Sequence, residues 1–174
     1  MNILQRVLVW ISRMGHCRGF GIHSPTDYQF VRHVVNEHWP YYAYAWLGKD
    51  DYWLTRKLGL LYFRLANWRQ PAVIVDGVGA GSYLQAGCRR AQLARQLTGG
   101  TVELALLPVE TRCQALLDHC DRSSVIVVEG IYRNWAAWHE LEADERVGTT
   151  FDLYYCGIIF CDIERFKHHY IINF

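Results

Sequence analysis

The stretch VIVDGVGAGSYLQAG, residues 73–87, contains the signal that decides the fold. A β-branched run, typical of a strand buried on both faces, leads into a turn with Gly77, Gly79 and Gly81, and a helical pattern follows from Tyr83. Glycines let backbone N–H groups approach a ligand without an intervening Cβ atom, and a helix start favours negative groups. A tight turn that only packs strand against helix uses the same residues. The loop is therefore either a ligand site or a structural turn.

Strand and helix patterns alternate downstream of Pro71. The expected elements after the first strand are a helix over 83–97, a strand over 101–109, a helix over 110–120, a strand over 123–130 and a helix over 134–144. Arg89, Arg90 and Arg95 are expected on the solvated face of the first of these helices. This alternation predicts parallel strands joined by right-handed crossovers, with ligands favoured at the carboxyl ends of the strands.

The two flanking segments have a different character. Residues 1–70 are aromatic and helical in pattern, and Ser24 is the expected N-cap of a helix with Pro25 at its first position and Asp27 reaching back. Residues 149–174 predict two or three strands, separated at Cys156–Gly157 and at residues 162–167. Such strands are expected to extend the parallel sheet in antiparallel fashion.

Composition limits the class of protein. The 174 residues suit one domain, and a content of 51% hydrophobic and 14% aromatic residues predicts a packed globule. A net charge of +1 gives no field for nucleic acid, and no apolar run is long enough to span a bilayer. The 6 cysteines form no CxxC motif and follow no export signal, so we expect reduced thiols in a cytoplasmic protein.

The GxGxG spacing of the loop is that of the S-adenosylmethionine loop of class I methyltransferases. Read together with GFGIHSPTDYQF at 19–30, YYAY at 41–44, SSVIVVEGIYRNW at 123–135 and the aromatic tail, the chain resembles a family of bacterial class I methyltransferase-like proteins. The resemblance implies a Rossmann-type fold and S-adenosylmethionine as cofactor. It implies cofactor-binding roles for Asp76, Gly77, Gly79, Gly81 and Ser82.

The same resemblance makes Glu129 and His23 the candidate catalytic residues and a small molecule the methyl acceptor. The chain departs from the family pattern, however, at the positions that carry chemistry. Val75 stands where the family has its strand acid, so Asp76 should point differently because strand side chains alternate. Gly130 replaces the second acid after Glu129, and Tyr132 replaces a histidine. One carboxylate is too few ligands for a hard cation, so we expect no metal site.

The chain is also short by at least one strand–helix unit between residues 97 and 123, which removes the expected ribose-binding acid and leaves Glu103 and Glu110 as substitutes. We therefore predict a shortened Rossmann-like, mainly parallel α/β sheet over 71–174, with a helical N-terminal cap over 1–70 and antiparallel C-terminal strands, as one structural unit. Exposed sheet edges predict a homodimer. Two functions follow: a methyltransferase-like protein with weak or no activity, or a non-catalytic binding or scaffolding module.

Overall fold

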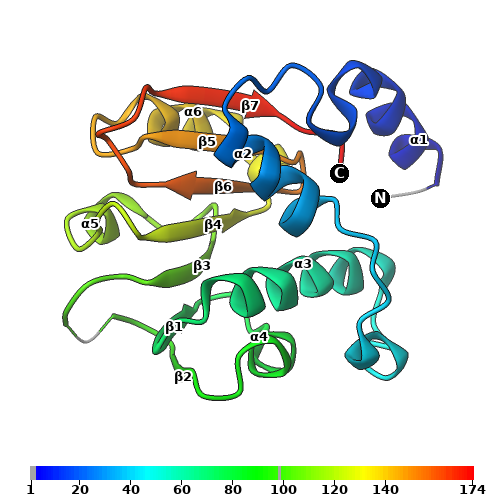
Figure 1. The fold of residues 1–174 in the computed structure, drawn as a ribbon, viewed down its shortest axis with the longest axis horizontal. Coiled ribbons are helices and arrows are strands. Elements are labelled where there is room, and N and C mark those ends of the chain that lie inside the picture. The colour runs from blue at the N-terminus through cyan, green and yellow to red at the C-terminus, as the bar shows by residue number, and fades with distance from the viewer. Residues whose placement is uncertain (1–2, 98) are drawn as a thin grey trace.

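The computed structural model describes residues 3–97 and 99–174, with Arg18 through its backbone alone. They form an α/β fold on one seven-stranded sheet of order β2-β1-β3-β4-β6-β5-β7 (Figure 1). The strands are β1 Val73–Asp76, β2 Gln92–Ala94, β3 Leu104–Pro108, β4 Val125–Glu129, β5 Thr149–Asp152, β6 Cys156–Phe160 and β7 His168–Ile171. The first four are parallel, β6 runs antiparallel to both β4 and β5, and β7 is parallel to β5. The expected α/β class with antiparallel C-terminal strands is confirmed.

The described residues before the sheet form helices and loops and no strand. They are α1 Ile3–Ser12, the 3₁₀ helix η1 Met14–Gly19, α2 Pro25–Phe30, the π-helix η2 Val31–Val35, the 3₁₀ helix η3 Tyr42–Ala45 and α3 Trp53–Arg69. The predicted N-cap is confirmed, because the Ser24 hydroxyl accepts from the Asp27 N–H at 3.4 Å. The Asp27 carboxylate, in contrast, is buried and binds the Arg165 guanidinium at 2.8 Å.

The sheet is covered on both faces. The helix α3 crosses one face with α2, whereas α6 Trp135–Ala143 lies behind the sheet in Figure 1. Alternate residues of each strand point to opposite faces of the sheet. Ile74 and Val127 pack on the face covered by α3, and Val75 and Val128 pack on the face covered by α6. The short helices α4 Gly81–Gly87, α5 Gln114–Leu117 and η4 Ile131–Arg133 complete the fold.

The helix expected over 83–97 is wrong in its second half. The helix α4 ends at Gly87, where a Cβ atom would lie 2.3 Å from the carbonyl oxygen of Phe63 in α3. Only a glycine permits this approach, and the chain turns away there. Residues 92–94 instead form β2 on the open side of β1, because pairing that edge satisfies backbone groups that a longer helix would leave exposed. Arg89 and Arg90 therefore lie in a turn, not on a helix.

The predicted break at Cys156–Gly157 is also wrong, since both residues begin β6. Gly157 is a strand residue because the indole of Trp138 packs against it, with ring atoms 2.2 Å from where a Cβ would stand. The chain reverses just before, at residues 153–155, where Tyr154 adopts a φ of 69°. The predicted separation of the last strands at 162–167 is confirmed. The expected helix over 110–120 is only the single turn α5.

Candidate functional site

The strand order marks where a ligand site is expected. The strand β2 pairs with one edge of β1, and β3 pairs with its other edge. The direction in which successive strands are added to the sheet therefore reverses between β1 and β3. In open α/β sheets the crevice outside the carboxyl ends of the strands at such a reversal is the usual ligand site. The glycine loop of residues 77–80 follows β1 at this point.

The Asp76 carboxylate lies inside the glycine loop. Its Oδ1 atom accepts the backbone N–H groups of Val78, Gly79 and Ala80 at 3.3, 2.8 and 3.0 Å. The side chain thus turns into the loop from its place at the end of β1. The loop amides are consequently occupied by a carboxylate of the chain itself. The field at this turn does not favour a negative ligand, contrary to the expectation from the glycine pattern alone.

The three glycines have different reasons to be glycine. Gly79 has a φ of 79°, and no atom lies within 4 Å of the position of a Cβ, so this residue faces open space. Gly77 packs on β3, because a Cβ would lie 3.0 Å from the Leu106 carbonyl oxygen. Gly81 packs near β2, with Leu93 Cδ1 at 3.1 Å. Gly77 and Gly81 allow the turn to pack closely against its neighbours. Gly79 borders free volume, and Ser82, three residues further along, is exposed.

Glu129 ends β4 at the same edge of the sheet. Its Oε2 atom accepts a 2.6 Å hydrogen bond from the hydroxyl of Tyr62, a buried residue of α3. Burial, together with the nearby charges of Cys156, Glu129 and Asp76, raises the pKa of Tyr62 well above its usual value. The phenol therefore remains a proton donor and holds the Glu129 carboxylate in place.

The residues after Glu129 have structural roles. Gly130 has a φ of 81°, and a Cβ there would lie 2.3 Å from Arg133 Nη2. Tyr132, at the position where the resemblance implies a histidine, stacks on Tyr154 with a centroid separation of 5.4 Å and an interplanar angle of 9°. Neither residue supplies the second acid or the imidazole of the family pattern.

Of the other sequence candidates, His23 and Glu103 lie away from this edge, whereas Glu110 lies at it. His23 is exposed beside Ser24, whose hydroxyl binds Arg165 in the loop after β6, so His23 lies at the amino end of β4 and away from Glu129. Glu103 accepts from the Ala72 N–H at 3.0 Å, before β1 begins, and so lies at the wrong edge for a ribose. Glu110 follows β3 and pairs with Arg133 in an exposed position.

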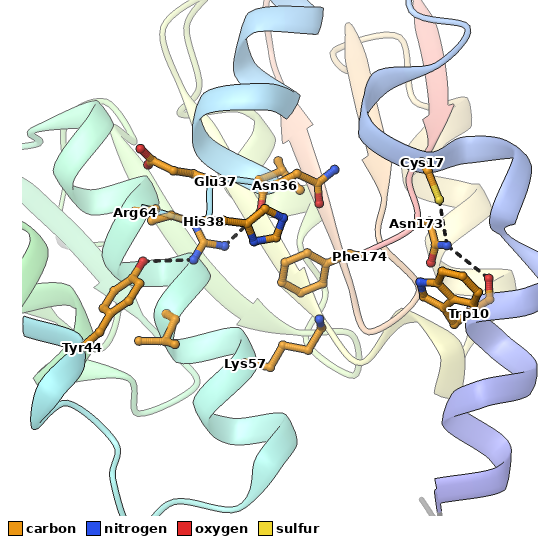
Figure 2. A pocket seen from close by; sticks show the side chains of 12 residues that line it. Trp10, Cys17, Asn36, Glu37, His38, Tyr44, Lys57, Arg64, Asn173 and Phe174 are labelled. Carbon is orange, nitrogen blue, oxygen red and sulfur yellow. Dashed lines mark hydrogen bonds between the residues drawn. The ribbon is translucent and has the colours of Figure 1, made fainter. Parts of the chain in front are cut away.

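A second set of residues at this edge was not identified from the sequence. A cleft of about 560 Å³ opens between α1, α3 and Phe174, and a neighbouring one of about 380 Å³ shares Trp10, Lys57 and Phe174 with it (Figure 2). The helical spacing of residues in α3 could have revealed this cleft from the sequence. Trp53, Lys57 and Leu61 fall four residues apart, which puts the lysine on the inward face of α3.

The chain matches none of the family models, curated proteins or solved structures with which it was compared. Residues 3–97 and 99–174 contain no group of three or more His, Cys, Asp or Glu side chains placed to hold a metal ion. None of the helices described is long and apolar enough to cross a membrane. The geometry of this edge of the sheet therefore indicates the function.

Proposed function

We propose that the chain is a class I methyltransferase-like protein that binds S-adenosylmethionine at the loop of Gly77, Gly79, Gly81 and Ser82. The observation that supports this most strongly is the loop fixed by three hydrogen bonds to Asp76 at the sheet's reversal point, with Gly79 facing open space. A preorganised loop binds a ligand without the entropic cost of ordering.

The charge at this edge favours S-adenosylmethionine over a phosphate-bearing cofactor. Asp76 and Glu129 end two strands of the same parallel set, and both act on the hydroxyl of Tyr62. Two carboxylates repel phosphate groups but attract the sulfonium and ammonium groups of S-adenosylmethionine. A dinucleotide or nucleoside triphosphate is the less suitable ligand on this ground.

Methyl transfer itself places few demands on the protein. Alignment of a nucleophile with the sulfonium methyl group can accelerate the reaction without a strong base. Glu129 would orient a small-molecule acceptor or accept its proton, because its carboxylate lies at the carboxyl edge of the sheet. His23 is exposed at the opposite edge and is not part of this proposal.

A specific observation favours the second function, a non-catalytic binding or scaffolding module. Glu129 already accepts a hydrogen bond from Tyr62, and Gly130 and Tyr132 provide no further acid or base beside it. Such a module would no longer bind the cofactor and would use the fold to bind a partner or to act as a scaffold.

Titration calorimetry with S-adenosylmethionine and S-adenosylhomocysteine tests the proposal. We expect micromolar binding by the natural chain and at least tenfold weaker binding by Gly79→Val. Gly21→Val is the matched control, because Gly21 also has a positive φ, of 85°, with no atom within 4 Å of its Cβ position. No heat with either ligand, or equal loss in both variants, would contradict binding at the loop.

Cofactor binding separates the two functions, and release of S-adenosylhomocysteine then reports turnover. Incubation with S-adenosylmethionine and a small-molecule extract should release it if the chain is an active enzyme. Absence of cofactor binding would favour the non-catalytic module, whereas binding without release would indicate a methyltransferase-like protein without activity.

A further inference from the structure

The cleft between α1, α3 and Phe174 is a place where ligand chemistry is available apart from the glycine loop. In Figure 2 the side chains of Lys57 and Phe174 point into its centre, with Trp10 and His38 on either side. Its volume of about 560 Å³ falls in the range of small-molecule sites. The walls combine aromatic rings with several hydrogen-bond donors.

Lys57 is a cation without an anionic partner among the side chains described. Its Nζ atom lies 4.2 Å from the centroid of the Phe174 ring and 5.7 Å from that of Trp53. Burial and the positive charges of Arg64 and Arg6 lower its pKa to about 8. A bound anion would reduce this excess of positive charge.

The charged groups Glu37 and Arg64 near Lys57 already have hydrogen-bond partners, so Lys57 is the group that would bind an anion. Glu37 also lines the cleft, but its Oε2 atom accepts from the Tyr41 hydroxyl at 2.7 Å. The guanidinium of Arg64 donates to the carbonyl oxygens of Val34 and Val35 and to the Tyr44 hydroxyl. Arg64 thus contributes charge while its hydrogen bonds are used elsewhere.

Asn36 also lines the cleft, but its Nδ2 atom is buried, has no hydrogen-bond partner among the described residues, and lies beyond the Phe174 ring from Lys57 in Figure 2. One carboxylate therefore does not reach both groups. The ammonium group of Lys57 is the charged donor available in the cleft, and it suits a carboxylate.

We propose that this cleft binds a small aromatic carboxylate, with the carboxylate on Lys57 Nζ and the ring against Trp10 and Phe174. The aromatic lining favours a ligand with a planar apolar ring over an inorganic anion or a sugar phosphate. The inference goes beyond the proposed function and does not depend on it, because the cleft and the glycine loop use different residues.

Calorimetric titration with 2-naphthoate, and with its uncharged amide as a comparison, tests this site. The natural chain should bind 2-naphthoate at least tenfold more tightly than 2-naphthamide. Lys57→Met should abolish that preference, whereas Lys49→Met, which changes an exposed lysine, should retain it. Equal binding of acid and amide by the natural chain, or no binding up to millimolar concentration, would overturn the proposal.

Reductive methylation of the natural chain gives a second readout that does not depend on a variant. Lys57 dimethylation, measured by mass spectrometry, should slow at least severalfold with saturating 2-naphthoate, whereas Lys49 and Lys167 should react unchanged. Unprotected Lys57 would overturn the site. Because S-adenosylmethionine is absent from both tests, their outcome is separate from that of the loop.

Discussion

Asp76 is the residue on which the geometry of the glycine loop depends. Replacing it with alanine removes the acceptor of three backbone N–H groups. We expect Asp76→Ala to lower the free energy of unfolding by about 1–3 kcal/mol, measured by urea denaturation. Asp50→Ala, at an exposed turn residue, should change it by less than about 0.5 kcal/mol. Equal stability of the two variants would show that the carboxylate does not hold the loop.

Lys57 should make stability depend on pH. Its folded-state pKa of about 8 lies below the usual 10.5, so the unfolded chain binds more protons between these values and folding gains stability as pH rises through them. The groups that face Lys57 are Arg6, Arg64 and Cys156.

Lys57→Met should therefore stabilise the protein at pH 7, by on the order of 1 kcal/mol. This advantage should shrink as the pH rises from 8 towards 10.5, which denaturation at several pH values would measure. A variant that is less stable than the natural chain at pH 7 would show that the lysine is not desolvated in the cleft.

At the residue scale, local patterns predicted the Ser24 cap and the position of the glycine turn. Both depend on neighbours within a few positions along the chain. The partners of Asp76 and the unpaired state of Lys57 could not be predicted in the same way. The partners of Asp76 are local, but they depend on its side chain turning into the loop, which residue spacing does not specify. The unpaired state of Lys57 depends on where α1 and Phe174 meet α3, which no short window of sequence contains.

Among the elements, β6 is constrained by a helix that packs closely on it. Gly157 has no room for a methyl group, since the indole of Trp138 in α6 occupies that space. We expect Gly157→Ala to lower the midpoint of thermal unfolding, with a cost of about 1–3 kcal/mol. Gly15→Ala, at a position where no atom of the described residues lies within 4 Å of a Cβ, is the matched control and should leave the midpoint nearly unchanged.

The elements also show where pattern reading fails. The strands β3 and β4 are continuous apolar runs and were predicted with nearly correct bounds. The strand β2 was hidden in a helical pattern, because its three residues are defined by pairing with β1 and not by their own periodicity. Short edge strands carry too little hydrophobic signal for spacing to identify them.

At the scale of the whole molecule, α1 presents an apolar surface. It is attached through polar residues: Arg13 binds Asp152 at 2.8 Å, and the Arg6 guanidinium lies 3.4 Å from the centroid of the Trp53 ring. Its apolar side chains remain exposed, with Leu4 at 66% and Leu8 at 56%. The sequence predicts a homodimer, and a dimer would cover such a surface.

Light scattering at micromolar concentration tests that prediction. The natural chain should have the mass of a dimer, and the double variant Leu4→Gln, Leu8→Gln should shift towards the monomer while it retains the same circular dichroism spectrum. A natural chain that is monomeric under these conditions would contradict self-association.

The proposed function depends on binding of S-adenosylmethionine at the loop after β1. A nitrogen-15 chemical-shift titration with S-adenosylhomocysteine tests this binding, because it reports each backbone amide separately. Binding at the loop predicts saturable shifts concentrated at residues 77–82 and at Glu129, with residues 19–25 unaffected. Shifts that are absent at millimolar ligand, or that centre away from residues 77–82, would contradict it and leave the glycine turn a structural element of the sheet.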